Sequence, residues 1–362
     1  MSESSVSAAA IYSARPSVRI GGQADERVNA LVSAMRMEEQ EGGMSALELR
    51  LANWVATPDG ASEIGFDGNS ALKLGAELQI GAGDASTPVE IFRGKVSALE
   101  LVCPYGQPPE LVVLAEDALT AARRARRTKV YAGMTPADVV QAVAGGLGLT
   151  PNVQGLTAPS GTWMQLNETD LGFLRRLVAR FDADLQVSGT DLTVSPRQDV
   201  QRGTVELTLY SQLARVRITA DLADQVTAVT VAGWNAQDGS AVSGHASSIT
   251  HAGPGSGKSG LAWALEVFGT RSEHVGAIAV SSDDEAQALA EAALDQRARR
   301  FVRAEGLAEG NARLRVGTQV RLAGVSAQHD NSYYVTQACH LFDLKQGYRT
   351  EFRAECAYLG NS

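Results

Sequence analysis

The chain has 362 residues, of which 41 are acidic and 32 are basic, so its formal net charge at pH 7 is −9. Nucleic-acid phosphates and anionic lipid headgroups repel such an acidic chain, which argues against specific nucleic-acid binding. Its length and its 44% hydrophobic content are sufficient for two or three domains with apolar cores.

The three cysteines, Cys103, Cys339 and Cys356, lie far apart in the sequence, and no CxxC motif is present. This spacing argues against a disulfide scaffold and against a zinc site. No apolar run is long enough to cross a membrane, so we expect no membrane insertion by this chain. The first residues lack the basic start and apolar centre of a secretion signal, and they predict a flexible N-terminal arm.

Short alternating runs between residues 15 and 115 predict antiparallel strands. The clearest run has Leu47, Leu49 and Leu51 alternating with Glu48 and Arg50. This alternation is typical of a strand with one buried and one wet face. Together with the N-terminal arm, these strands define a first sheet domain, residues 1–115.

Residues 116–200 predict a small α/β domain. Its first helix has Thr135 as N-cap, Pro136 in the first turn and Asp138 completing a capping box. The second helix has Asn167 as its candidate N-cap and one apolar face. That face consists of Leu171, Leu174, Leu177, Val178 and Phe181. The apolar period then changes to that of strands, which predicts a β-hairpin after the helix.

A run of arginines opens this part of the chain: Arg123, Arg124, Arg126 and Arg127. Such a run could bind phosphate or dock an acidic partner. A charge run this short is more often a solvated face, and we favour that interpretation. Should the run dock a partner, a protein is favoured over DNA because the chain as a whole is acidic.

Residues 201–362 predict a second sheet domain that carries an insertion at about 235–310. The insertion contains a polar stretch, interpreted as a long loop, and a helix from Ser282 to Arg303 with a capping box at its start. The last strand, 348–356, alternates apolar and charged residues. The expected fold class is therefore β-rich α+β, with two antiparallel sheet domains flanking a small α/β domain.

One glycine-rich segment fits a relaxed phosphate-binding loop: Ala252-Gly-Pro-Gly-Ser-Gly-Lys258-Ser259. In a true loop of this kind, backbone N–H groups and the lysine bind phosphates after a buried parallel strand. Residues 243–251 contain only one large aliphatic, Ile249, and cannot form that strand. We favour a structural loop, and a nucleotide-binding enzyme that uses Lys258 is the alternative.

No other residues form a pattern that carries chemistry, so we assign no catalytic, cofactor-binding or metal-binding residue and expect no enzyme activity. Three histidines lack further ligands at fixed spacing: His245, His251 and His274. Three carboxylates at a strand end would share one wet environment: Glu38, Glu39 and Glu41. Four tryptophans are interpreted as core or subunit-contact residues, the alternative being stacking platforms of a secreted carbohydrate-binding protein: Trp54, Trp163, Trp234 and Trp263.

The order of several motifs resembles a known family. The motifs are MTPADVVQAVAGGLGL and NETDLGFLRRLVARFDADLQV within 134–187, and VSSDDEAQALAEAALDQRARRFVRAEG, GNARLRVGTQVRLAGV, YYVTQACHLFD and GYRTEF within 280–352. Together with residues 15–54 they cover most of the chain. They resemble the late control D family of phage tail hub proteins and the hub portion of VgrG-type spike proteins of contractile injection systems.

This resemblance implies that each sheet domain is a tube-like β-barrel and that the chain is a homotrimeric baseplate hub. Such a hub joins the six-fold tail tube to the trimeric spike and contacts other baseplate subunits. Because the chain stops after the hub portion, we expect a separate spike polypeptide and a phage-type tail. The hub of a non-phage contractile injection system is the alternative. The expected location is the virion tail baseplate, or an extracellular injection particle, assembled in the bacterial cytoplasm.

A weak internal repeat suggests that the two sheet domains are copies of one design. Lys73–Ile80 aligns without gaps on Arg315–Leu322, at an offset of 242 residues. Continuing without a gap places Phe92 on Tyr334 and Leu99 on Leu341. Two such copies in each subunit of a trimer would provide six similar modules.

Overall fold

The computed structural model describes residues 15–56, 59–66, 70–84, 86–157, 160–200, 202–276 and 280–360. Most of the expected N-terminal arm, residues 1–14, lies outside these ranges. Strands dominate the described residues, so the β-rich fold class is confirmed. None of the described helices is both long and apolar enough to cross a membrane.

The first third of the chain forms a sheet in the expected region. Its strands are β1 (Ser17–Ile20), β2 (Gln23–Ala24), β3 (Val32–Gln40), β4 (Ser45–Ala52), β7 (Glu77–Ala82), β8 (Val89–Val102) and β9 (Glu110–Glu116). A short helix, α2 (Glu26–Leu31), and a small hairpin, β5 (Trp54–Ala56) and β6 (Ser62–Ile64), accompany them. The alternation predicted for β4 is confirmed, because Leu47, Leu49 and Leu51 are all buried.

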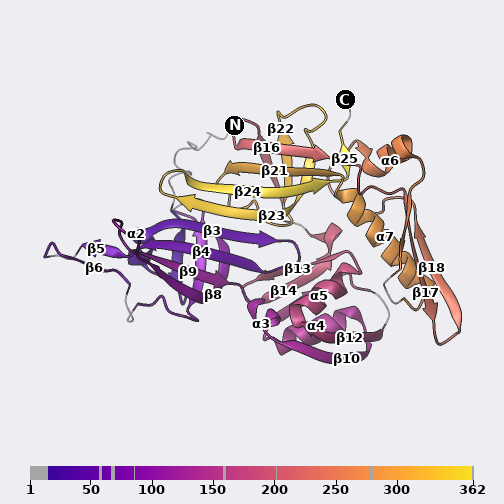
Figure 1. The fold of residues 1–362 in the computed structure, drawn as a ribbon, viewed down its shortest axis with the longest axis horizontal. Coiled ribbons are helices and arrows are strands. Elements are labelled where there is room, and N and C mark those ends of the chain that lie inside the picture. The colour runs from indigo at the N-terminus through magenta and orange to yellow at the C-terminus, as the bar shows by residue number, and fades with distance from the viewer. Residues whose placement is uncertain are drawn as a thin grey trace.

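The last third of the chain supplies β15 (Thr204–Thr208), β16 (Leu213–Ala220), β21 (Val302–Glu309), β22 (Gln319–Ala323), β23 (Ser332–Asp343) and β24 (Gly347–Cys356). These strands do not form a separate barrel. They join the first set in one 13-stranded sheet, because β3 pairs with β23. Two closed barrels are not confirmed, since the pairing among the described residues forms no closed sheet. Figure 1 shows β23 and β24 lying beside β3 and β4.

The two sets of strands pair in the same order. The first set runs β1-β7-β8-β9-β4-β3, and the second runs β15-β22-β23-β24-β21-β16. In the first set every neighbouring pair from β7 to β3 is antiparallel, and in the second set every neighbouring pair from β22 to β16 is antiparallel as well. Only the outermost pair differs, because β1 is antiparallel to β7 whereas β15 is parallel to β22. The two sets of strands are therefore structural copies within one sheet.

Two β-bulges fix the correspondence residue by residue. Between β8 and β9 the register shifts after Val96, and between β23 and β24 it shifts after Val335. Between β3 and β4 it shifts after Val32, and between β16 and β21 it shifts after Leu213. The alignment of β7 with β22 at offset 242 is consistent with this pairing.

The ungapped continuation of that alignment is wrong by three residues. The shared register places Lys95, not Phe92, on Tyr334, because these two residues pair with Glu116 and Glu355 at corresponding positions. The connection between the paired strands is three residues shorter in the second copy. A pattern of alternating residues could not detect such a gap, because only strand pairing defines register.

The small α/β domain between the copies has its own core. It contains α3 (Thr120–Arg123), β10 (Arg126–Met134), α4 (Pro136–Gly146), β11 (Thr150–Val153), β12 (Gly161–Thr169), α5 (Asp170–Ala179), β13 (Ala183–Ser188), β14 (Asp191–Pro196) and the 3-10 turn η1 (Arg197–Asp199). The capping box of α4 is confirmed. The N-cap of α5 is Thr169 rather than Asn167, which adopts a positive φ of 49° at the end of β12.

An insertion between β16 and β21 forms a second small unit. It contains β17 (Ala228–Asn235), β18 (Ser240–Ala246), β19 (Lys258–Ser259), α6 (Gly260–Phe268), β20 (Ser272–Val275) and α7 (Asp283–Arg299), and β19 pairs with the C-terminal β25 (Tyr358–Leu359). The stretch predicted as a long loop is partly wrong, because β18 pairs with β17 along its whole length. In Figure 1, α7 lies along β17 and β18.

Candidate functional site

The junction between the two sheet copies is an antiparallel pairing of β3 with the second half of β23. The paired residues run from Ala34 opposite Asp343 to Gln40 opposite Gln337. On the inner face of this junction Met35, Met37, His340 and Phe342 are all buried. The apolar core of the first copy therefore includes Phe342 and Tyr348 of the second copy.

A buried ion pair locks one end of this junction. Arg315 donates from Nε to Glu39 Oε1 over 2.8 Å, and the backbone N–H of Val316 donates to the same oxygen over 2.7 Å. Burial acts to raise the pKa of the Glu39 carboxyl, but the Arg315 charge and these hydrogen bonds outweigh it, so that pKa lies below its usual value. The expectation of one wet environment for the carboxylate cluster is wrong for Glu39, which is only 6% exposed.

Two further ion pairs, both from Arg197, connect the small domain to the two sheet copies. Arg197 of η1 is buried and forms ion pairs with Glu41, just after β3, over 2.7 Å and with Glu355 of β24 over 2.5 Å. Its guanidinium also lies 4.1 Å from the ring centroid of Tyr334. No local sequence pattern indicated a role for Arg197, because its partners lie far away in the chain. Its role is structural in this arrangement.

The glycine-rich loop is fixed to the C-terminal strand rather than open to a ligand. A Cβ on Gly257 would collide with the carbonyl oxygen of Leu359, and one on Gly255 would lie 2.5 Å from the Cys356 sulfur. Lys258 forms an ion pair with Glu266 and lies 3.8 Å from the Trp263 ring centroid. Lys258 therefore has both of these partners within the chain. The strand before the loop, β18, is antiparallel to β17, unlike the strand of a phosphate-binding loop.

Three arginines of the run form contacts with neighbouring residues of the same chain. Arg123 pairs with Glu116, Arg126 donates to the Asn167 carbonyl over 2.9 Å, and Arg127 pairs with Asp170 over 3.1 Å. These contacts join β10 and α3 to neighbouring elements, although all three side chains remain largely exposed.

The other candidate residues are dispersed. Within the described ranges, no group of three or more His, Cys, Asp or Glu side chains is placed to hold a metal ion. Among the tryptophans, Trp163 donates to the Met134 carbonyl over 2.9 Å and packs against the small-domain core. Trp54 and Trp234 are 47% and 60% exposed, so these two are not core residues, and their interpretation as subunit-contact residues stays a prediction.

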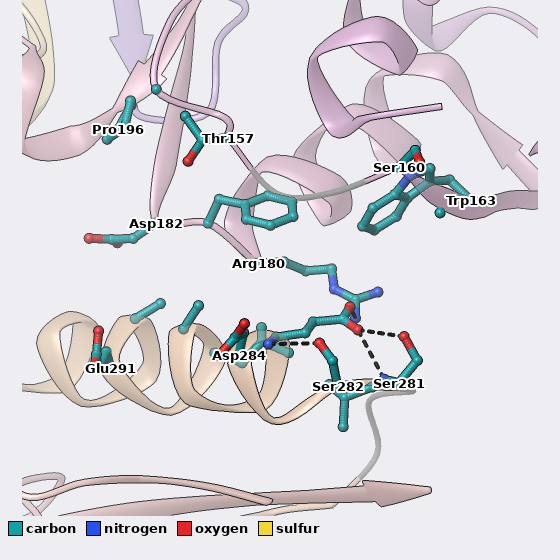
Figure 2. Close-up of a pocket in the computed structure, with 18 of the residues that line it drawn as sticks. Thr157, Ser160, Trp163, Arg180, Asp182, Pro196, Ser281, Ser282, Asp284 and Glu291 are labelled. Atoms are coloured by element: carbon teal, nitrogen blue, oxygen red, sulfur yellow. Dashed lines mark hydrogen bonds and ion pairs between the residues drawn. The ribbon is translucent and has the colours of Figure 1, made fainter. Parts of the chain in front are cut away.

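A cleft of about 800 Å³ lies between the small domain and α7. Figure 2 shows Trp163, Arg180 and Asp182 on one side and the first turns of α7 on the other. Arg180 bonds Glu285 over 2.9 Å and lies 5.4 Å from the Trp163 ring centroid. The ion pair with Glu285 spans the cleft, so this part of its lining joins the insertion to the small domain.

This fold is that of phage tail proteins. The structure is similar to the 43 kDa tail protein of prophage MuSo2 from Shewanella oneidensis, at 11% identity, with 94% of this chain and 97% of that chain covered and a TM-score of 0.67. It is also similar to a tail protein from Neisseria meningitidis MC58, at 12% identity, 95% and 97% coverage and a TM-score of 0.64.

A third similar structure belongs to an Escherichia coli component of the type VI secretion system, at 13% identity, 95% and 79% coverage and a TM-score of 0.54. No curated protein matches the sequence. The family model described as the Alg8 N-terminal domain matches residues 60–343, so the chain belongs to the Alg8 N-terminal domain family. The coarse resemblance to phage tail and injection-system proteins is confirmed, and membership of the late control D family stays a prediction.

Proposed function

We propose that this protein is a structural hub of a contractile phage-type tail baseplate. The observation that carries the proposal is the pair of sheet copies, which share strand order, register and two bulges and are joined edge to edge. A hexameric tail tube requires six equivalent contacts, whereas a trimer provides three. Three chains with two copies each provide six similar sheets, so a homotrimer of this fold can join a six-fold tube to a three-fold spike.

The proposed partners are the tail tube protein, a trimeric spike protein and other baseplate subunits, at the baseplate of a virion tail assembled in the bacterial cytoplasm. The functional units are residues 1–115, 116–200 and 201–362, with the insertion after β16 carried by the last one. The negative net charge of −9 suits a passage for DNA, because it repels phosphates. No residue is assigned a catalytic or cofactor-binding role.

The hub of a non-phage contractile injection system is the second candidate. The similarity to the type VI secretion component favours it. Gene context separates the two candidates: tail genes beside this one support the phage tail, and secretion-system genes support the alternative. A nucleotide-binding enzyme is disfavoured, because Lys258 and the loop glycines are committed to contacts within the chain.

Light scattering coupled to size-exclusion chromatography tests the proposal. The expected mass is three times that of the 38.1 kDa chain, and averaged electron micrographs are expected to show a ring of six similar modules around a three-fold axis. A chain that stays monomeric at every concentration, or forms an assembly without a three-fold axis, contradicts the trimeric hub. Calorimetric titration with ATP is expected to show no saturable binding.

A further inference from the structure

The two strand edges that meet in the internal junction each have a counterpart elsewhere in the sheet. In the junction, β3 of the first copy pairs with the second half of β23 of the second copy. The positions of the bulges show that β16 is the counterpart of β3 and that β8 is the counterpart of β23. The second half of β8 and the strand β16 therefore correspond to the two edges that meet inside the chain.

Both counterpart edges are unpaired in the described part of the chain. β7 pairs with β8 only up to Lys95, and β8 from Ala98 to Val102 pairs with β9 alone. Apart from an isolated bridge between Leu213 and Leu209, β16 pairs with β21 alone. An open edge strand presents free N–H and C=O groups and is a template for pairing with another chain.

The open edges carry exposed apolar side chains at positions whose counterparts in the internal junction are buried. Leu99 and Leu101 are 36% and 58% exposed, whereas their counterparts in the paired edge, Ala338 and His340, are fully buried. On the other strand, Val216 and Ile218 are partly exposed, and their counterparts, Met35 and Met37, are buried. Exposed apolar side chains on an open edge favour a protein partner over solvent.

We propose that β16 of one copy of this chain pairs with the second half of β8 of a second copy, antiparallel and in the register of the internal junction. Within the chain Met37 lies opposite His340, and Met35 lies opposite Phe342. Transferring these pairs to the counterpart residues places Ile218 opposite Leu101 of the partner copy and Val216 opposite Cys103 of the partner copy.

The charges on the other face of the two edges are complementary. The same register places Arg217 opposite Val102, which makes Glu100 its diagonal neighbour, and both charged side chains are exposed. Opposite charges at diagonal positions on neighbouring strands attract each other. The contact is heterologous, since each copy offers one edge and receives the other, so it closes into a ring only when the rotation per copy matches. The inference rests on the proposed hub for its ring of three copies.

Disulfide cross-linking between copies tests this pairing. Cys103 is exposed and free, so only one further cysteine has to be introduced. The single substitution Val216→Cys is expected to give disulfide-linked dimers and trimers on mild oxidation, seen on non-reducing gels, since directly opposed strand residues lie within disulfide reach. Adding Cys103→Ser should abolish the cross-link. Arg217→Cys, whose side chain lies on the other face, is the matched control and should not cross-link.

A second measurement does not depend on disulfide geometry. Leu101→Asp should raise the dissociation constant of the trimer about 100-fold, because an aspartate would be buried without a partner in the contact. Val89→Asp is the control: Val89 is also exposed and lies on β8, but beside β7 rather than at the open edge. It should leave the dissociation constant unchanged.

The outcomes separate this inference from the proposed function. A wild-type trimer that neither cross-links through Cys103 in the Val216→Cys variant nor weakens with Leu101→Asp would overturn the edge pairing and leave the hub intact. Equal cross-linking of the Arg217→Cys variant would overturn the register. A wild-type chain that is monomeric at all concentrations contradicts the hub itself, and the edge pairing with it.

Discussion

Glu39 and Arg315, 276 residues apart in the sequence, form a bidentate ion pair across the junction of the two sheet copies. Arg315 Nη2 donates to Oε2 and its Nε donates to Oε1, and Oε1 also accepts the Val316 N–H. The pair connects β3 with the segment before β22, so it reports directly on whether the two copies are joined.

The substitution Glu39→Gln should lower the free energy of unfolding by about 3 kcal/mol at pH 7, because it leaves the Arg315 charge, whose side chain is only 20% exposed, without its carboxylate partner. The measurement is urea unfolding at one fixed protein concentration. Glu38→Gln is the matched control on the same strand. Its ion pair with Arg36 is partly exposed, so the expected loss is below about 1 kcal/mol. Equal losses for the two variants would argue against a special role for the junction pair.

His340 makes the junction sensitive to pH. Its ring is fully buried, its Nδ1 lies 2.8 Å from the Tyr348 hydroxyl, and burial lowers its pKa to about 3. In the unfolded chain this pKa is about 6.5. The stability that neutral His340 provides is therefore complete above pH 6.5 and is lost as the pH falls toward 3.

The expected loss from this residue is about 1.4 kcal/mol per pH unit, or about 2 kcal/mol between pH 6.5 and pH 5. His340→Leu, which places here the residue type of its counterpart Leu101, should flatten the profile over that range even if it lowers stability at pH 7. Unfolding free energies at several pH values check this. The exposed His245→Gln is the control and should keep the wild-type slope. An unchanged slope in His340→Leu would show that the ring is not the titrating group.

Substitutions in the loop around Lys258 test whether this loop has a structural role or binds a nucleotide. Gly257 has a φ of 124° and no room for a Cβ, whereas Lys258 contributes one partly exposed ion pair and one cation–π contact. Gly257→Ala should therefore lower the melting temperature clearly. Lys258→Ala should cost only about 1 kcal/mol. Saturable ATP binding that disappears in Lys258→Ala, with folding intact, would reverse this interpretation.

Local patterns predicted the elements well. The alternation in β4, the capping box of α4 and the apolar face of α5 depend on neighbours within one turn or one strand, and all three are present. Ser282 is the N-cap of α7, as expected, but the Glu285 carboxylate accepts from the Ser281 N–H rather than from the Ser282 N–H, so the expected capping box is only half formed. These features follow from short-range spacing, which a single sequence contains in full.

The junction could not be predicted, because it depends on which strands pair. Met37 and His340 lie about 300 residues apart, and nothing in either strand specifies the other. Alternation also could not show whether each sheet closes by itself or joins its neighbour. The two barrels were expected from the family resemblance, whereas the described strands form one continuous sheet. Glu39 looked solvated for the same reason: its partner Arg315 is remote in the sequence.

The last prediction concerns α5, the helix whose apolar face is the clearest pattern in the sequence. Leu174 lies at the centre of that face and is fully buried in the core of the small domain, among side chains of α4 and β13. Leu174→Asp would bury a charge without a partner, so we expect several kcal/mol of destabilisation, on the order of the whole stability of a domain.

Arg176→Asp on the same helix is the control. Its side chain is 51% exposed and pairs with Glu168, so its loss should be small, about 1 kcal/mol or less. Thermal melting of both variants, with the yield of soluble protein, is the measurement. Because α5 belongs to the small domain rather than to the sheet junction, unfolding of Leu174→Asp in a separate, earlier transition would show that the small domain is a cooperative unit of its own. A soluble Leu174→Asp protein with an unaltered melting temperature would contradict the burial of this face.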